Sequence, residues 1–208
     1  PFIETEDQLN TIEDIKSDFL KKYPSDRLIV GDVAYGKSEI IIRAVFLISK
    51  SNLQSLILVP TTLLARQHFY NFVERFKYFG IKIKQLSRLV SISEKNEIIN
   101  KLKTGKIDCV VGTHALLSEN IEFKNLGLIV VDEEQHFGVK TKEKLKNLSS
   151  NAHIITLSAT PIPRTLNLSL SGIKELSLML TPPYERLSIR TYISLFDKVT
   201  IKEAIKRE

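Results

Sequence analysis

The chain has 208 residues, 43% hydrophobic and 26% charged, which is the composition of a globular domain and not of a disordered or fibrous protein. No apolar run approaches membrane-spanning length, and a lone cysteine, Cys109, excludes a disulfide framework. We therefore expect a cytoplasmic protein. The net charge of +6 favours a polyanion such as nucleic acid, although a lysine-rich solvated surface explains it equally well.

Strand-like and helix-like segments alternate along the chain. Apolar runs predict strands over 27–30, 55–59, 81–86, 108–112, 128–131, 154–158, 176–178 and 187–193. Helical patterns and capping residues predict helices over 5–20 (capped by Thr5 or Asp7), 39–47, 61–78, 93–103 (capped by Ser93), 140–148, 163–170 and 197–207. This alternation predicts an α/β fold, a mostly parallel sheet with helices on both faces.

A glycine-rich turn stands between the first expected strand and the next helix. Its residues match the phosphate-binding pattern G-x-x-x-x-G-K-S: Gly31, Asp32, Val33, Ala34, Tyr35, Gly36, Lys37 and Ser38. The glycines let successive N–H groups point at an anion, and the helix that follows adds partial positive charge. We expect Lys37 to reach the β- and γ-phosphates of ATP, and the Ser38 hydroxyl to bind Mg²⁺. The flanking strand and helix disfavour the alternative, a glycine turn that opens an ordinary helix.

Two acidic residues follow the apolar run 128–131. Asp132 is expected to bind Mg²⁺, through water, opposite Ser38, and Glu133 to orient and deprotonate the attacking water. An acidic turn after a strand is common, so this assignment depends on the P-loop.

Small polar residues follow the other expected strands. Because ligands collect at the carboxyl ends of parallel strands, these residues are candidates for a site. Hydroxyls, backbone N–H groups and one arginine suit phosphodiester contacts at Thr61, Thr62, Ser87, Arg88, Thr113 and His114. In the run Ser158-Ala159-Thr160, the two hydroxyl residues could hydrogen-bond the acidic pair. Helix capping, or a plain strand-to-turn junction, explains these positions as well. The four histidines lack metal-ligand spacing, so no zinc site is expected.

Together these motifs resemble the first RecA-like lobe of a superfamily-two helicase or translocase. The resemblance narrows to the bacterial transcription-repair-coupling factors, the Mfd family, over 1–8, 31–33, 59–65, 112–114, 132–139 and 157–166. RecG helicases share residues 160–165 and are the alternative. They normally lack Glu39 and the run Thr181-Pro182-Pro183 found here.

The resemblance implies an ATP-driven translocase on double-stranded DNA that displaces stalled RNA polymerase and recruits nucleotide-excision repair. The polymerase and repair contacts would lie in domains absent from this chain. The RecG alternative acts on branched DNA. A third interpretation, a nucleotide switch without motor activity, is disfavoured because a switch does not need the base Glu133.

The same resemblance assigns roles to individual residues. Phe2 and Gln8 would contact adenine, and the six candidates named above would lie along the DNA backbone. A further set would couple nucleotide binding to DNA binding: Glu134, Gln135, Ser158, Ala159, Thr160 and Arg164. The family usually has glycine and phenylalanine where Ala34 and Tyr35 stand, so Ala34 is expected to keep φ below zero. His136 replaces a usual arginine.

The resemblance also implies a domain organisation. Residues 1–194 would form the first lobe, and 195–208 would begin a linker or second lobe. The chain begins at Pro1 without an initiator methionine, so we expect a piece of a longer protein. The arginine finger of the second lobe would be missing, and the chain alone would hydrolyse ATP slowly.

Overall fold

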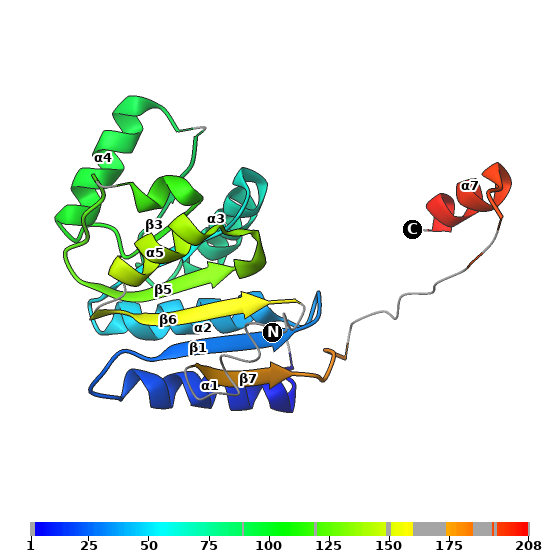
Figure 1. The fold of residues 1–208 in the computed structure, drawn as a ribbon, viewed down its shortest axis with the longest axis horizontal. Helices are drawn as coiled ribbons and strands as arrows, with labels where there is room; N and C mark the ends of the chain where they lie inside the picture. The colour runs from blue at the N-terminus through cyan, green and yellow to red at the C-terminus, as the bar shows by residue number, and fades with distance from the viewer. Residues whose placement is uncertain are drawn as a thin grey trace.

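The structure is a computed structural model that describes residues 3–88, 90–118, 120–148, 151–159, 174–184, 193 and 195–207. Its strands form one sheet in which every neighbouring pair is parallel, in the order β3-β4-β2-β5-β6-β1-β7 (Figure 1). The strands are β1 Asp26–Gly31, β2 Gln54–Leu58, β3 Ile83–Leu86, β4 Cys109–Gly112, β5 Leu126–Asp132, β6 His153–Ser158 and β7 Glu175–Met179. The predicted α/β fold with a parallel sheet is confirmed.

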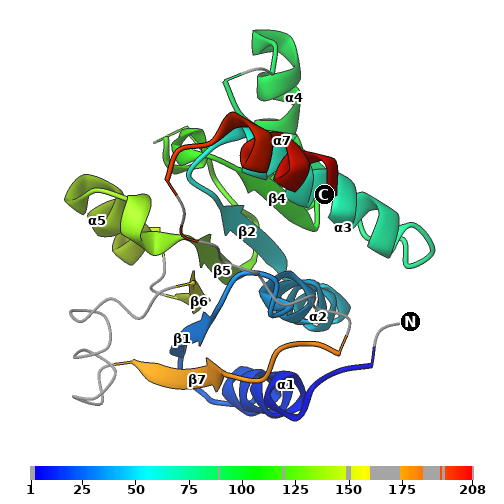
Figure 2. The same cartoon turned by 90° about the vertical axis from the view of Figure 1, so that its right-hand side faces the viewer.

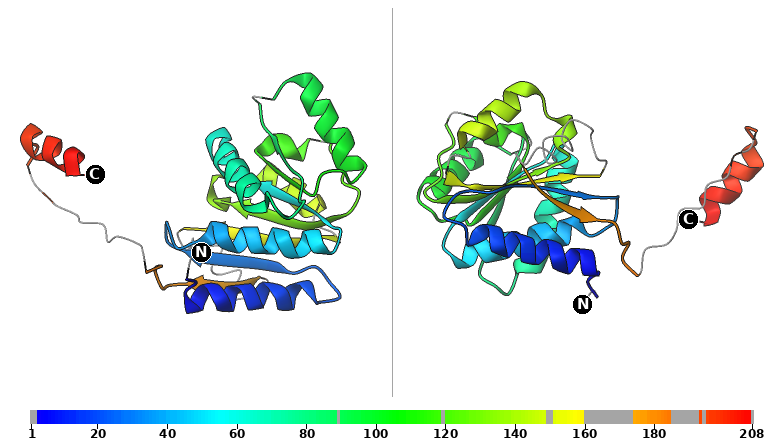
Figure 3. Two further views of the ribbon diagram at one scale, coloured as in Figure 1. Left: turned by 180° about the vertical axis from the view of Figure 1, so that it is seen from behind. Right: turned by 60° about the horizontal axis from the view of Figure 1, so that its bottom comes forward.

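Helices cover both faces of this sheet (Figures 2 and 3). One face carries α1 Glu6–Phe19, α2 Lys37–Lys50 and α3 Thr62–Phe76. The other carries α4 Ile92–Lys103, the short helix η1 His114–Leu117 and α5 Val139–Leu148. A second short helix, η2 Glu134–His136, follows β5. Among the described residues, no helix is long and apolar enough to cross a membrane.

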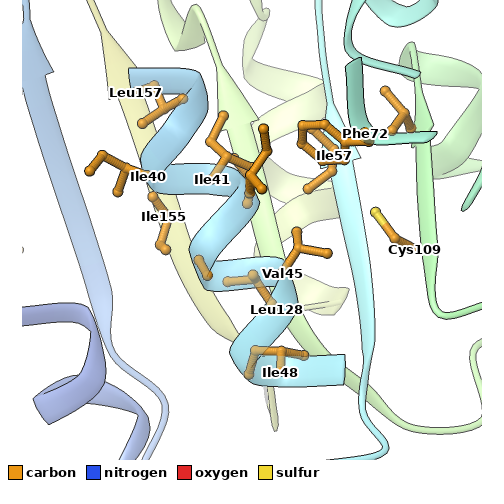
Figure 4. Packing of buried hydrophobic residues seen from close by; sticks show 14 of the residues in the cluster. Ile40, Ile41, Val45, Ile48, Ile57, Phe72, Cys109, Leu128, Ile155 and Leu157 are labelled. Atoms are coloured by element: carbon orange, nitrogen blue, oxygen red, sulfur yellow. The ribbon is translucent and has the colours of Figure 1, made fainter. Parts of the chain in front are cut away.

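Neighbouring residues of the central strands point to opposite faces, which creates two hydrophobic cores. Ile57 and Val130 pack under α1, α2 and α3, whereas Leu56 and Ile129 pack under α4 and α5. The apolar residues of α2 that lie on the first core include Ile40, Ile41, Val45 and Ile48 (Figure 4). Burying one such side chain contributes about 1.5–3 kcal/mol, so the core holds α2 and its first turn firmly against the sheet.

A buried ion pair fixes α1 to the sheet. Arg27 of β1 donates from Nε to Asp18 Oδ2 at 2.5 Å and from Nη1 to Ser177 Oγ of β7 at 2.8 Å. Burial alone would raise the pKa of Asp18, but the hydrogen bonds from Arg27 and Lys21 outweigh it and the pKa is lowered. The C-terminal half of α1 is therefore held by both β1 and β7.

The first turn of α1 is anchored separately. Thr5 caps the helix: its Oγ1 accepts from the Gln8 N–H, and Gln8 Oε1 accepts from the Thr5 N–H. Asp7 Oδ2 accepts from the backbone N–H groups of Leu180, at 2.8 Å, and Thr181, at 2.7 Å. These hydrogen bonds lower the pKa of Asp7. The anchoring places the start of α1 where the chain leaves β7.

Some expected boundaries differ from the structure. Helix α4 is capped by Ser91, whose Oγ accepts from the Glu94 N–H at 3.3 Å, so the expected cap Ser93 is wrong. The sequence offered two serines, and the earlier one has the extended backbone that a cap needs. The expected helix over 163–170 and most of the strand over 187–193 lie outside the described residues.

The last helix, α7 Lys198–Arg207, buries none of its residues and lies apart from the sheet (Figure 1). Asp197 caps it by accepting from the Val199 and Thr200 N–H groups. The boundary expected near residue 194 stays a prediction.

Candidate functional site

The carboxyl ends of the strands line up along one edge of the sheet. The strand register shows this through five pairs: Leu86 with Gly112, Gly112 with Leu58, Leu58 with Val131, Asp132 with Leu157, and Ser158 with Val30. The loops that follow these strands therefore leave the sheet side by side. The P-loop and the Asp132–Glu133 pair lie at one half of this edge, separated by β6 alone.

Two glycines of the P-loop are required by close contacts. A Cβ on Gly31 would meet the Met179 Cβ of β7 at 2.9 Å. Gly36 has φ +81°, and a Cβ there would lie 2.3 Å from Gln8 Nε2. Gly36 is also the N-cap of α2, and no side chain caps the helix there. The first N–H groups of α2 are thus left to an anion, as a phosphate site requires.

Ala34 contradicts the backbone conformation expected for it. Its φ is +65°, in the left-handed region, whereas we expected a negative value. A non-glycine residue pays about 1–2 kcal/mol for that conformation. The turn between β1 and α2 imposes it, because the loop must reverse within few residues, and hydrogen bonds to Asp32 brace the turn: Val33 N–H to Oδ1 at 2.7 Å and Tyr35 N–H to the Asp32 carbonyl at 3.3 Å.

Lys37 lies folded across the P-loop. Its ammonium donates to the carbonyl oxygens of Gly31, at 2.5 Å, and Asp32, at 2.9 Å. Burial lowers the pKa of Lys37, while the charges of Glu133, Asp132 and Asp32 act in the opposite direction. The acidic pair is therefore close enough to Lys37 to interact with the ammonium across the site.

Gln8 also contacts the P-loop. Its Nε2 donates to the Tyr35 carbonyl at 2.9 Å, and the residue is 5% exposed. The structure thus brings the predicted adenine contact Gln8 to the phosphate loop. Phe2, the other predicted adenine contact, lies outside the described residues, as do Thr160 and Arg164.

The two acidic residues have different surroundings. Asp132 is the last residue of β5 and is 9% exposed. Glu133 has φ +55° and ψ +52°, a strained conformation for a residue with a side chain. Gln135 Nε2 donates to Glu133 Oε2, and Glu134 forms an ion pair with Lys142 of α5 at 3.0 Å. The turn that carries Glu133 is therefore held internally by Gln135 and externally by Lys142 of α5.

Sequence reasoning missed a direct partner of Asp132. His68 of α3 places Nε2 3.0 Å from Asp132 Oδ2, and the histidine is 6% exposed. The helical spacing of buried positions could have indicated it. Ala65, Phe72 and Phe76 form the buried stripe of α3, and His68 lies on that stripe. A polar residue facing a core needs a partner, but the sequence could not say which one.

The predicted DNA contacts lie at the other half of the same edge. Thr61, Arg88 and His114 are exposed, and Thr62 is half-buried. Thr61 Oγ1 also caps α3 by accepting from the Leu64 N–H at 3.2 Å. Ser87 is buried, and so is Thr113, whose hydroxyl has no hydrogen-bond partner among the described residues. Exposure therefore suits a ligand at three of the six positions without any rearrangement.

Two of the expected coupling residues lie close to the P-loop strand. Ser158 is buried and pairs in register with Val30, and Ala159 is half-buried. The predicted end of this strand at Ser158 is confirmed.

The donor set fits a metal bound together with phosphates. Within the part of the chain that the structure describes, no cluster of three or more histidine, cysteine or acidic side chains could hold a metal ion. Mg²⁺ usually takes one or two carboxylates and completes its shell with phosphate oxygens and water. One hydroxyl, Ser38, and one carboxylate, Asp132, are what such an ion needs from the protein.

A parallel sheet with a P-loop and an acidic pair at its strand ends is typical of ATP-binding domains. The family model described as DEAD/DEAH box helicase matches residues 5–168, so the chain belongs to that family. The family assignment makes this an ATP-binding lobe of a superfamily-two enzyme. Proteins named transcription-repair-coupling factor are similar to this chain over its whole length, and the resemblance inferred from the motifs is confirmed.

Three of these relatives show the range of similarity. The protein of Rickettsia typhi (strain ATCC VR-144 / Wilmington) is 54% identical, that of Bacillus subtilis (strain 168) 48%, and that of Escherichia coli (strain K12) 46%, each over 100% of this chain. The chain spans 19% of the first and 18% of each of the other two.

Solved structures of helicases share the fold. The structure of RecG bound to three-way DNA junction has a TM-score of 0.83 at 33% identity, over 100% of this chain and 28% of that one. The DUF1998 helicase MrfA bound to DNA and AMPPNP has a TM-score of 0.66 at 21% identity, over 83% and 26%. The second likeness shows the fold alone.

Proposed function

We propose that this chain is the first lobe of an ATP-driven translocase on double-stranded DNA, which in its full-length parent displaces stalled RNA polymerase and couples transcription to repair. The single observation behind this is that six polar residues predicted to follow the DNA backbone and the P-loop with its acidic pair share one sheet edge. The names of the relatives support the coupling role. The polymerase and the repair protein would be contacted by other parts of the parent, and the setting would be the cytoplasm.

The chain's own groups divide the work of ATP hydrolysis. The uncapped first turn of α2 would bind the phosphates, and Lys37 would leave the carbonyls of Gly31 and Asp32 to reach the terminal phosphates. Mg²⁺, when bound, would neutralise charge that develops on the phosphate oxygens. Ser38 and Asp132 would hold that ion, while Glu133 would take the proton of the attacking water.

DNA would be held through its backbone and not through its bases. Thr61, Arg88 and His114 offer a hydroxyl, a cation and an imidazole at exposed positions. Such contacts fix the position of a protein on a duplex without reading sequence. DNA binding by this lobe should therefore be weak, independent of sequence and sensitive to salt.

A RecG-like helicase lobe that acts on branched DNA is the second candidate. The observation in its favour is the close structural likeness to RecG bound to a three-way junction. The identity of 33% is nevertheless lower than the 46–54% shared with the coupling factors, so we rank it second.

One experiment separates the two. A chain extended through the second lobe is given ATP and either a duplex that carries a third-strand oligonucleotide or a three-way junction. A translocase displaces the third strand and leaves the junction paired. Separation of the junction strands without displacement of the third strand would favour the RecG-like function, and neither activity would reject both.

A further inference from the structure

A buried histidine contacts the carboxylate that we assign to the metal. His68 Nε2 lies 3.0 Å from Asp132 Oδ2, with the two side chains only 8% and 13% exposed. Little water reaches the pair, so water cannot readily replace either partner. The contact therefore determines which way the Asp132 carboxylate turns.

The surroundings of His68 hold its ring in place. Phe72, one turn further along α3, meets the imidazole edge to face, with 5.9 Å between ring centroids and 82° between the ring planes. Ala65 and Phe72 are both 0% exposed. An imidazole packed in this way has little rotational freedom, and the backbone of α3 fixes where its Nε2 lies.

The position of the His68–Asp132 pair in the sheet suggests a role beyond stabilising the fold. Asp132 ends β5 at the edge where the P-loop begins, and its charge acts on Lys37. The same carboxylate thus faces a buried histidine on one side and the phosphate site on the other. The orientation that His68 gives to the Asp132 carboxylate therefore also determines how this carboxylate is presented to the phosphate site.

We propose that His68 is a positioning residue: its Nε2–H holds Asp132 Oδ2, so that the other oxygen, Oδ1, is directed to the Mg²⁺ that Ser38 also binds. The inference rests on the proposed function. Hydrogen-bonded partners of metal ligands orient the ligand, and their loss typically costs about 10–100-fold in metal affinity or activity. His68 does not touch the metal or the nucleotide, so it acts through Asp132 alone.

Two variants of His68 test whether a hydrogen-bond donor must reach Asp132, because both carry an amide but differ in length. His68→Gln places an amide nitrogen near the position of Nε2, whereas His68→Asn is one carbon shorter and cannot reach Asp132. The readout is the binding of a fluorescent ADP analogue to this chain at increasing Mg²⁺, and also without metal. For His68→Asn we expect the Mg²⁺ concentration at half-maximal effect to rise about 10–100-fold. Affinity without metal should be unchanged, and His68→Gln should behave as the unmodified chain.

A second histidine serves as the control. His153 is half-buried, accepts hydrogen bonds from Ser25 and packs on Phe19 with 4.9 Å between ring centroids, at the amino end of β6 and away from the carboxyl ends of the strands. His153→Asn should leave the Mg²⁺ dependence unchanged. Thermal melting verifies that each variant folds. If His68→Asn does not fold, His68→Met replaces it, because methionine keeps the volume and lacks the donor.

The outcomes separate this inference from the proposed function. If Asp132→Asn abolishes the Mg²⁺ dependence and His68→Asn keeps it, the positioning role is overturned and the metal site stands. Equal losses in His68→Gln and His68→Asn would also overturn it. If the unmodified chain binds the nucleotide without any Mg²⁺ dependence, the metal assignment fails and the inference fails with it.

Discussion

The two halves of the sheet edge differ in how their polar groups are held. In the half formed by β5, β6 and β1, the charged groups contact the protein itself: Lys37 binds loop carbonyls, Asp132 binds His68, and Glu133 binds Gln135. In the half formed by β2, β4 and β3, Arg88 and His114 are exposed. This difference agrees with the proposed roles, because groups held in one geometry suit a small ligand and exposed polar groups suit contacts to the backbone of a polymer.

Helix α3 belongs to both halves. It begins at Thr62, next to the exposed Thr61, and carries His68 to Asp132 on its inner face. A ligand that moved the start of α3 would therefore act on the carboxylate of the other half.

The largest expected effect tests whether the nucleotide half is complete. It carries the proposed binding groups and the proposed base, but in the two-lobed motors that this chain resembles a further cation, the arginine finger, comes from the second lobe. An absent arginine finger costs about 10³–10⁵-fold in rate, which corresponds to about 4–7 kcal/mol. We expect the 208-residue chain to release phosphate that much more slowly than a chain extended through the second lobe. Equal rates would show that the site is self-contained.

Glu133→Gln should have the next largest effect. An amide cannot accept the proton of the water, and general-base catalysis contributes about 10²–10⁴-fold. In the extended chain we expect a loss of this size in the turnover number, with nucleotide affinity preserved. Glu143→Gln is the matched control, because Glu143 is an exposed residue of α5 to which no role in the site is assigned. Normal turnover in Glu133→Gln would place the base elsewhere.

Lys37→Ala should weaken binding and leave the fold intact. A hydrogen bond to a charged group is worth about 1.5–3 kcal/mol, so calorimetric titration with an ATP analogue and Mg²⁺ should show a loss of about 10–100-fold. Lys50→Ala, at the exposed far end of the same helix, should bind normally. Unchanged affinity in Lys37→Ala would reject the P-loop assignment.

Arg88→Ala tests the exposed half. Loss of one phosphate contact should reduce the slope of log affinity against log salt by about 1, with the same loss for every duplex sequence. Titrations of two duplexes at several salt concentrations measure this, with Lys50→Ala again as the control. A loss confined to one sequence would contradict a backbone contact.

The smallest effect concerns strain in the nucleotide half. Ala34→Gly removes the cost of a positive φ but adds freedom to the unfolded chain, so we expect a gain in stability below about 1 kcal/mol. The melting temperature should then rise by no more than about 2–4 °C. Ala44→Gly, in the buried middle of α2, should lower it. A lower melting temperature for Ala34→Gly would mean that the loop is not strained.

The sequence predicted what depends on local patterns. Apolar runs marked the strands, and the P-loop and acidic pair fell at strand ends, because such motifs require a set spacing along the chain. The strand order, the hydrogen bond between Arg27 and Ser177 and the contact between His68 and Asp132 join distant segments, and no local pattern encodes them. Ala34 was misjudged because the turn overrides the preference of its own residue.

The position of β1 in the sheet has a consequence for synthesis. Its neighbours β6 and β7 come much later in the chain: Ser25 bonds His153 across 128 residues, and Arg27 bonds Ser177 across 150. By contrast, β2, β3 and β4 all lie within residues 54–112 and can pair as soon as that stretch is made. Distant pairings must close long loops and form slowly. On the ribosome, then, the half proposed to contact DNA can assemble first, whereas the strands on both sides of β1 become available only when most of the lobe has emerged.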